Sequence, residues 1–314
     1  MTVAAALVLY VVTVLSIGPR LLARITAHGE APRLAIAAWL TAVVTVLGCA
    51  VAAIGLLLVE AAGHWDSPDR LIASCVERLH AILQGHAGLP AQIIATAAVV
   101  IAIGSLIAIC ARIGQALRRM RSNTLAHADA VRLVGTSHGG DVIVIKASEA
   151  AAYCVAGRPA AIVVTTAALT ALDEAQLAAV IAHERAHLDG RHTYCVAALR
   201  GVTSALPWIR LFTIAATHIG SLLEMCADDA AARRHGRQPL LGGLLALSGA
   251  DTPAHGLAAS AIAVLVRAER LADPPHGIAR IQTLLTLSGA VAAMAATPLA
   301  IVALALSGAL ICFA

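Results

Sequence analysis

Charged and aromatic residues are scarce in this sequence, and each shortage excludes a class of protein. Of the 314 residues, 13% are charged, 3% are aromatic and 60% are hydrophobic. Soluble domains carry about 25% charged and about 45–50% apolar residues, so a wholly soluble protein is excluded. Lysine occurs only at Lys146, and no aromatic platform accompanies the arginines, so direct binding of nucleic acid is not expected. The net charge of +4 suits the flanks of membrane helices better.

Acidic and basic residues are absent from four long blocks, at 1–19, 34–59, 79–111 and 281–314. A helix rises 1.5 Å per residue, so about 20 apolar residues cross a hydrocarbon core of about 30 Å. We expect transmembrane helices at about 2–18, 34–59 and 91–111, and a fourth within 281–314. The first block has the length of a cleaved signal peptide, but no basic residue precedes its apolar run, which favours a retained span.

These spans divide the chain into three parts. Residues 1–111 form an N-terminal membrane region, 112–280 a domain outside the bilayer, and 281–314 a C-terminal transmembrane helix. Arginine and lysine resist translocation, and arginines are concentrated in the first connection and just after the third span. We therefore expect a multi-pass protein in the lipid bilayer, with its N-terminus outside and the region 112–280 in the cytoplasm.

The predicted cytoplasmic region begins with the pattern of a small β-sheet, and a predicted helix follows. Apolar residues alternate over 131–133 and 142–144 across a glycine-rich turn, which predicts a hairpin, and 161–165 predicts a third strand. Asp173 begins a capping-box pattern, which predicts a helix from there to Gly190. The expected fold class is a membrane α-helical protein of about four transmembrane helices with a cytoplasmic α+β domain containing a small β-sheet.

The predicted helix contains His183-Glu184-Arg185-Ala186-His187. Two histidines four residues apart lie on one helical face, near enough for both imidazoles to bind one Zn²⁺. The glutamate beside the first histidine can act as general base on a metal-bound water. The alternative is a pair of surface histidines beside a solvated glutamate, but chance gives this spacing only about 0.014 times in a chain of this composition.

A catalytic zinc site needs a third protein ligand and an open position for water. Glu224 and Asp228 stand one helical turn apart in a downstream stretch that is helical by propensity. Glu224 is the natural third ligand for one Zn²⁺ per chain, and Asp228 could accept a hydrogen bond from the outer nitrogen of a ligand histidine. The alternative is that both acids belong to an exposed helix face.

The stretch 201–223 is apolar enough to form a fifth span. A single crossing would place Glu224 across the membrane from His183 and His187, so the zinc hypothesis forbids it. We expect a buried or interfacial helix, or a re-entrant hairpin. Further polar residues near these motifs are expected to be packing or surface groups, although one of them could stabilise an oxyanion: His192, Arg200, His218 and His235.

Several motifs together resemble a known group of enzymes. The run Ala161-Ile162-Val163-Val164-Thr165-Thr166, the segment Leu172-Asp173-Glu174-Ala175-Gln176-Leu177, the His-Glu-x-x-His helix and the later Glu-x-x-x-Asp are similar to those of gluzincin-type integral-membrane metallopeptidases. Three spans before the catalytic region and one after it resemble the BlaR/MecR antirepressor family. HtpX-like proteases share the motifs but usually place further spans between the two zinc-binding helices.

The resemblance implies a role for each matching residue. His183, His187 and Glu224 would be the zinc ligands, Glu184 the catalytic acid/base, and Asp228 the partner of a ligand histidine. By analogy with the gluzincin fold, the strand before the zinc helix would be the sheet edge that pairs with an extended peptide substrate. That strand comprises Ala161, Ile162, Val163, Val164 and Thr165.

The preferred function is a zinc endopeptidase of the bacterial cell membrane that cleaves a cytoplasmic BlaI/MecI-like winged-helix repressor. One alternative is an HtpX-like quality-control protease that degrades damaged membrane proteins. Another is a receptor or transporter with a structural metal site. A structural site would need a fourth protein ligand, usually cysteine, and Cys226 lies on a different helical face from Glu224.

The sequence departs from the BlaR/MecR pattern at its end. Those receptors carry an extracellular penicillin-binding domain after the last span, whereas this sequence ends at Ala314, close to its fourth apolar block. No fused sensor domain is therefore expected. Only a loop of roughly 30 residues, around 64–89, faces outward, and so short a piece rarely folds alone.

Overall fold

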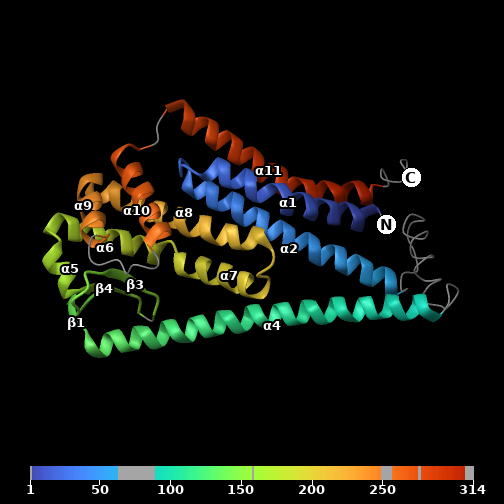
Figure 1. Ribbon diagram of the computed structural model, residues 1–314, viewed down its shortest axis with the longest axis horizontal. Helices are drawn as coiled ribbons and strands as arrows, with labels where there is room; N and C mark the ends of the chain where they lie inside the picture. The colour runs from blue at the N-terminus through green and yellow to red at the C-terminus, as the bar shows by residue number, and fades with distance from the viewer. Residues whose placement is uncertain (1, 63–88, 158, 249–256, 275–276, 308–314) are drawn as a thin grey trace.

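The computed structural model describes residues 2–62, 89–157, 159–248, 257–274 and 277–307 (Figure 1). Long helices run side by side over most of the molecule, and a small β-sheet with shorter helices forms one end. Most of the predicted outward loop, and the end of the predicted last span, lie outside the described residues.

Three of the described helices are long and apolar enough to cross a membrane: α1 (Thr2–Thr26), α2 (Pro32–Ala62) and α11 (Gly277–Leu306). They pack against one another, and Trp39 is fully buried among them. The Tyr10 hydroxyl lies 2.9 Å from Thr45 Oγ1 and 2.8 Å from Met294 O, so it joins all three helices. The first helix continues past the predicted end at residue 18, through Pro19.

The predicted third span, 91–111, lies within α4 (Leu89–Val134). This 46-residue helix runs through the predicted domain boundary at residue 112 without a break. Among the described residues α4 is not one of the helices that meet the length and apolarity of a span, so four crossings stay a prediction.

The first strand of the predicted hairpin was placed wrongly. Residues 131–134 form the last turn of α4, and β1 is Thr136–Gly139, which pairs antiparallel with β2 (Val142–Ile145). Val131 is buried beside Ala128, three residues earlier, whereas Leu133 and Val134 are exposed. The apolar residues therefore follow a helical period and not the period of a strand.

The sheet has the order β1-β2-β4-β3, with β3 at Ala152–Val155 and β4 at Ala161–Thr165. β4 pairs in parallel with β2 and antiparallel with β3, and all five of its residues are buried. The prediction that Ala161–Thr165 is the free edge is therefore wrong, because both sides of this strand already have partners. The edge on that side is β3, a short strand that the sequence pattern did not indicate.

The remaining helices surround the sheet and connect it to the long helices. They are α5 (Thr166–Ala171), α6 (Glu174–Asp189), α7 (His192–Ala205), α8 (Arg210–His235), α9 (Arg237–Ser248) and α10 (Leu257–Ala272). The predicted capping box of α6 is present, since Asp173 Oδ1 accepts from the Gln176 N–H at 2.8 Å and Gln176 Oε1 accepts from the Asp173 N–H at 3.1 Å.

The apolar stretch 201–223 is not one continuous helix. α7 ends at Ala205, a turn follows, and α8 begins at Arg210, so the two helices form a hairpin. α7 packs against α4, and α8 packs against α2 and α6 (Figure 1). Glu224 is thereby brought to the same end of the molecule as α6, as the zinc hypothesis requires.

Candidate metal centre

Two imidazoles meet on one face of α6. His183 and His187 lie four residues apart, and their Nε2 atoms are 3.1 Å from each other. The rings stand edge to face, with centroids 4.9 Å apart. Their Nε2 atoms therefore converge on one point.

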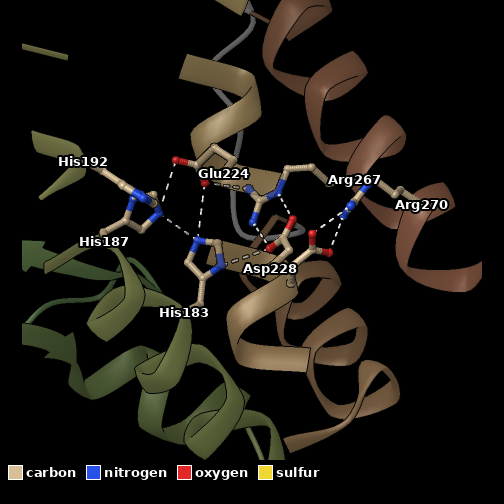
Figure 2. Close-up of polar contacts among 8 residues, drawn as sticks. His183, His187, His192, Glu224, Asp228, Arg267 and Arg270 are labelled. Atoms are coloured by element: carbon tan, nitrogen blue, oxygen red, sulfur yellow. Dashed lines mark hydrogen bonds and ion pairs between the residues drawn. The ribbon is translucent and has the colours of Figure 1, made fainter. Parts of the chain in front are cut away.

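Glu224 reaches the same point from α8 (Figure 2). Its Oε2 is 3.4 Å from His183 Nε2, and its Oε1 is 3.5 Å from His187 Nε2. Ligands at 2.0–2.1 Å from a tetrahedral zinc stand about 3.3 Å from one another. The donor atoms of His183, His187 and Glu224 all lie within 4.8 Å of one another, so their chemistry and spacing fit a zinc ion with one position left for water.

Asp228, one turn after Glu224 on α8, contacts the other ring nitrogen of His183. Its Oδ1 is 3.0 Å from His183 Nδ1, although the contact is bent from ideal hydrogen-bond geometry. Burial lowers the pKa of His183, but the carboxylates of Asp228 and Glu224 outweigh it and raise the pKa to about 9. The Asp228 side chain is only 1% exposed, so its charge acts in a dry environment.

Arg267, from α10, forms ion pairs with both acids. Its Nε and Nη2 donate to the two Asp228 oxygens at 2.8 and 2.7 Å, and its Nη1 is 3.1 Å from Glu224 Oε2. Burial raises the pKa of Glu224, yet the two histidines and the Arg267 guanidinium together hold it below the ordinary value. One turn along α10, Arg270 pairs in the same forked manner with Asp229.

The outer nitrogen of His187 also has a partner. His192 Nδ1 is 2.9 Å from His187 Nδ1. Arg191 takes a left-handed backbone conformation (φ 51°), so α7 starts directly after α6 and its first residue returns to the site. Burial, followed by the charge of His187, lowers the pKa of His192 to about 4. A neutral His192 beside His187 can fix the tautomer that leaves His187 Nε2 free to bind a metal.

Glu184 lies between the two histidines in sequence and against β3 in space. Burial raises its pKa, while the neighbouring His183 and His187 imidazoles, and to a smaller degree the backbone of Cys154, act in the opposite direction. A raised pKa suits a group that must both take and release a proton near neutral pH.

The structure thus brings His183, Glu184, His187, Glu224 and Asp228 together. Three other polar residues considered from the sequence lie away from the site. His218 stacks on Trp39, with ring centroids 5.1 Å apart, and Arg200 and His235 are exposed on the surface. Neither Arg267 nor the contact of His192 with His187 was predicted from the sequence. The available signal for Arg267 was a pair of arginines one turn apart at the end of a helix whose first ten residues carry no charge.

Part of the chain matches a known protein family. Residues 115–230, which contain α6, Glu224 and Asp228, match the family model described as Peptidase family M48. The chain is also similar to the crystal structure of S. mikatae Ste24p, with 12% identity and a TM-score of 0.32, over 94% of this chain and 99% of that chain. No curated protein matches the chain. The family match supports a metallopeptidase.

Proposed function

We propose that this protein is a membrane zinc endopeptidase in which His183, His187 and Glu224 bind the ion and Glu184 is the acid/base. The observation that carries this proposal is the convergence of three donor atoms at the separations that a tetrahedral ion requires. The family match over the same residues supports it independently. In the described residues the site includes no fourth protein ligand, which argues against a closed structural site.

A zinc ion bound there would supply Lewis acidity, lowering the pKa of a water molecule from 15.7 to about 7 and polarising the scissile carbonyl. Glu184 takes a proton from the attacking water and passes it to the leaving nitrogen. Asp228 and His192 hold the two imidazoles in orientation, and Arg267 keeps Glu224 and Asp228 ionised.

An extended substrate would pair with β3. Thr165 N donates to Ala151 O, and hydrogen-bonded pairs alternate with non-bonded pairs along an antiparallel ladder. Ala152 and Cys154 therefore direct their N–H and C=O groups away from β4. Helix α6, which carries Glu184, packs against β3, and this packing supports a substrate edge that borders the catalytic group. Backbone pairing along β3 would place a peptide bond next to Glu184.

The activity can be tested on the full-length protein in detergent with β-casein as substrate. We expect one zinc per chain, loss of cleavage with a chelator, and recovery with Zn²⁺. Glu184→Gln should retain the zinc and lose cleavage by about 10²–10⁴-fold, whereas Glu174→Gln, an exposed acid of the same helix, should behave as wild type. Undiminished cleavage by Glu184→Gln would exclude its proposed role.

For the biological role we infer regulatory cleavage of a BlaI/MecI-like winged-helix repressor on the cytoplasmic side of a bacterial cell membrane. No candidate membrane span of the described residues lies between α6 and α8, unlike the HtpX-like arrangement, and one span follows the catalytic region. Incubation with a purified repressor, with and without chelator, tests this role. Cleavage of casein and of misfolded membrane proteins but not of the repressor would favour quality control.

A further inference from the structure

An arginine-lined cavity of about 890 Å³ lies outside the metal centre. Its wall is formed by the turn between α1 and α2, the end of α8, the start of α9, the end of α10 and the start of α11, which Figure 1 shows gathered at one end of the long helices. Its basic residues are Arg33, Arg233, Arg237, Arg270 and Arg280.

The cavity has a surplus of positive charge. Its two acidic residues already have partners: Asp229 pairs with Arg270 at 2.8 Å, and Glu30 accepts from the Thr283 hydroxyl. Within the described part of the chain the other four arginines have no ion-pair partner. Four unpaired guanidinium groups around one cavity favour an anionic occupant.

The cavity also lies at the polar end of the candidate membrane spans. Arg33 is the second residue of α2, and Arg280 stands in the first turn of α11. Both candidate spans, Pro32–Leu56 and Gly277–Leu304, begin at the cavity wall. This is the depth at which the charged groups of phospholipids lie when such helices are in a bilayer.

The guanidinium group presents a planar fork of donors that matches the oxygens of a phosphate. We propose that this cavity binds the phosphate head group of an anionic phospholipid, with Arg33 and Arg280 contacting the phosphate from two different spans. A soluble phosphate offers the same chemistry, but only a lipid is held at this depth beside the ends of the spans. An acidic protein segment is the competing macromolecular occupant.

The cavity is lined by residues that neighbour Asp228 and Arg267, the two residues that hold the candidate metal ligands in place. Asp229 and Arg270 line it, and their neighbours Asp228 and Arg267 contact the metal ligands. A head group seated here would therefore contact the same two helices, α8 and α10, that position Glu224. The lipid site itself does not depend on the proposed peptidase activity.

Native mass spectrometry of the full-length protein in detergent can test the proposal. The probes are phosphatidylglycerol, phosphatidylcholine of the same chain length, inorganic phosphate at matched ionic strength, and a glutamate-rich peptide. We expect retention of phosphatidylglycerol at least about tenfold above phosphatidylcholine. Arg33→Gln/Arg280→Gln should lose that preference by about tenfold, and Arg33→Lys/Arg280→Lys by less. Arg119→Gln/Arg121→Gln removes the same charge from α4 and should bind as wild type.

Several outcomes would overturn the assignment. Equal losses in the cavity variant and in the α4 control would mean that lipid follows net charge and not this cavity. Binding of inorganic phosphate without phosphatidylglycerol would make the site one for a soluble anion. Stronger retention of the acidic peptide, abolished by the cavity substitutions, would make it a protein-docking site. Circular dichroism of each variant shows whether lost binding reflects lost folding.

Discussion

At the scale of single residues, Arg267 joins both carboxylates of the metal centre from a third helix, α10. It contacts Asp228 through two hydrogen bonds and Glu224 through a third nitrogen, and its side chain is only 13% exposed. Two carboxylates this close to each other would repel without it, and burial alone would push both toward the neutral form. Arg267 is therefore a positioning residue, because it keeps the Glu224 carboxylate charged and correctly placed.

Replacing Arg267 should be costly because it would leave Asp228 buried with a reduced set of partners. We expect Arg267→Met to lower the free energy of unfolding by about 3–5 kcal/mol, the usual effect of breaking a buried ion pair. Arg270→Met breaks a pair with Asp229, whose side chain is 36% exposed and can be hydrated when it is unpaired, so it should cost less than Arg267→Met although the Arg270 side chain is only 9% exposed. Denaturant unfolding in detergent measures the free energy of unfolding of both variants. Equal decreases in the two variants would contradict the larger contribution that we assign to Arg267.

His192 should matter for metal affinity and little for folding. We expect His192→Ala to weaken zinc binding by about 10–100-fold, because His187 would lose the group that orients its ring. Competition with a zinc chelator measures the affinity. His138→Ala removes an exposed histidine of β1 and should leave the affinity unchanged.

Residues that are close together in the sequence could be predicted, whereas residues brought together by the packing of helices could not. His183, Glu184 and His187 could be assigned from spacing alone, because helix geometry fixes their relation within one turn. Glu224 and Asp228 followed from their own one-turn spacing and the need for a third ligand. Arg267 and the contact of His192 with His187 depend on how α10 and α7 pack on α8 and α6, and no local pattern encodes that packing.

At the scale of elements, β3 shows where sequence patterns failed. β4 is a continuous apolar run, which is the signature of a strand with neighbours on both sides, whereas β3 has only four residues and no clear alternation. The hydrophobic strand was easy to recognise, yet the inconspicuous one beside it has the free backbone edge. A strand with neighbours on both sides, such as β4, has no backbone groups left to pair with a substrate, whereas an edge strand such as β3 does.

A proline at position 152 should test whether β3 binds substrate. Ala152→Pro removes an N–H that points away from β4, so the sheet loses no ladder bond. We expect kcat/KM on a peptide substrate to fall by about tenfold, the equivalent of one lost hydrogen bond, with zinc content unchanged. Ala152→Ser keeps the N–H and serves as the control; equal losses in both variants would argue for a side-chain effect.

Asp141 and Arg185 connect the start of β2 to the catalytic helix. The hydrogen bond from Arg185 holds the pKa of Asp141 below its ordinary value of 3.8. Because the folded-state pKa is lowered, the pair stabilises the protein above the unfolded pKa of about 3.9 and loses this effect as the pH falls through the folded value.

Asp141→Asn should therefore unfold more easily than wild type at pH 7, by about 0.2–1 kcal/mol because the pair is partly exposed. The difference should narrow below about pH 4. Thermal unfolding across this range measures it, with Asp189→Asn, an exposed acid at the end of the same helix, as the control. A difference that does not change with pH would mean that the charge of Asp141 is not the cause.

At the scale of the whole molecule, blocks of apolar residues predicted the long helices well, and the three candidate spans of the described residues coincide with predicted spans. Their lengths and their packing did not follow from composition. α1 extends beyond its apolar block, and α4 continues far past its own, because helices end where caps and tertiary contacts dictate and not where hydrophobicity stops. That residues 201–223 do not make a single crossing of the membrane was predicted from the need to bring Glu224 to His183 and His187, and not from hydropathy.

The hairpin has one more consequence, for the topology of the chain. His187 lies in α6, before the hairpin, and Glu224 lies in α8, its second helix, so an ion held by both would close a ring of backbone that contains α7, as a disulfide would. That ring opens whenever the ion leaves. The protein would then have a reversible cross-link at its catalytic centre, and the cellular supply of metal would set how firmly the second donor helix is tethered to the first.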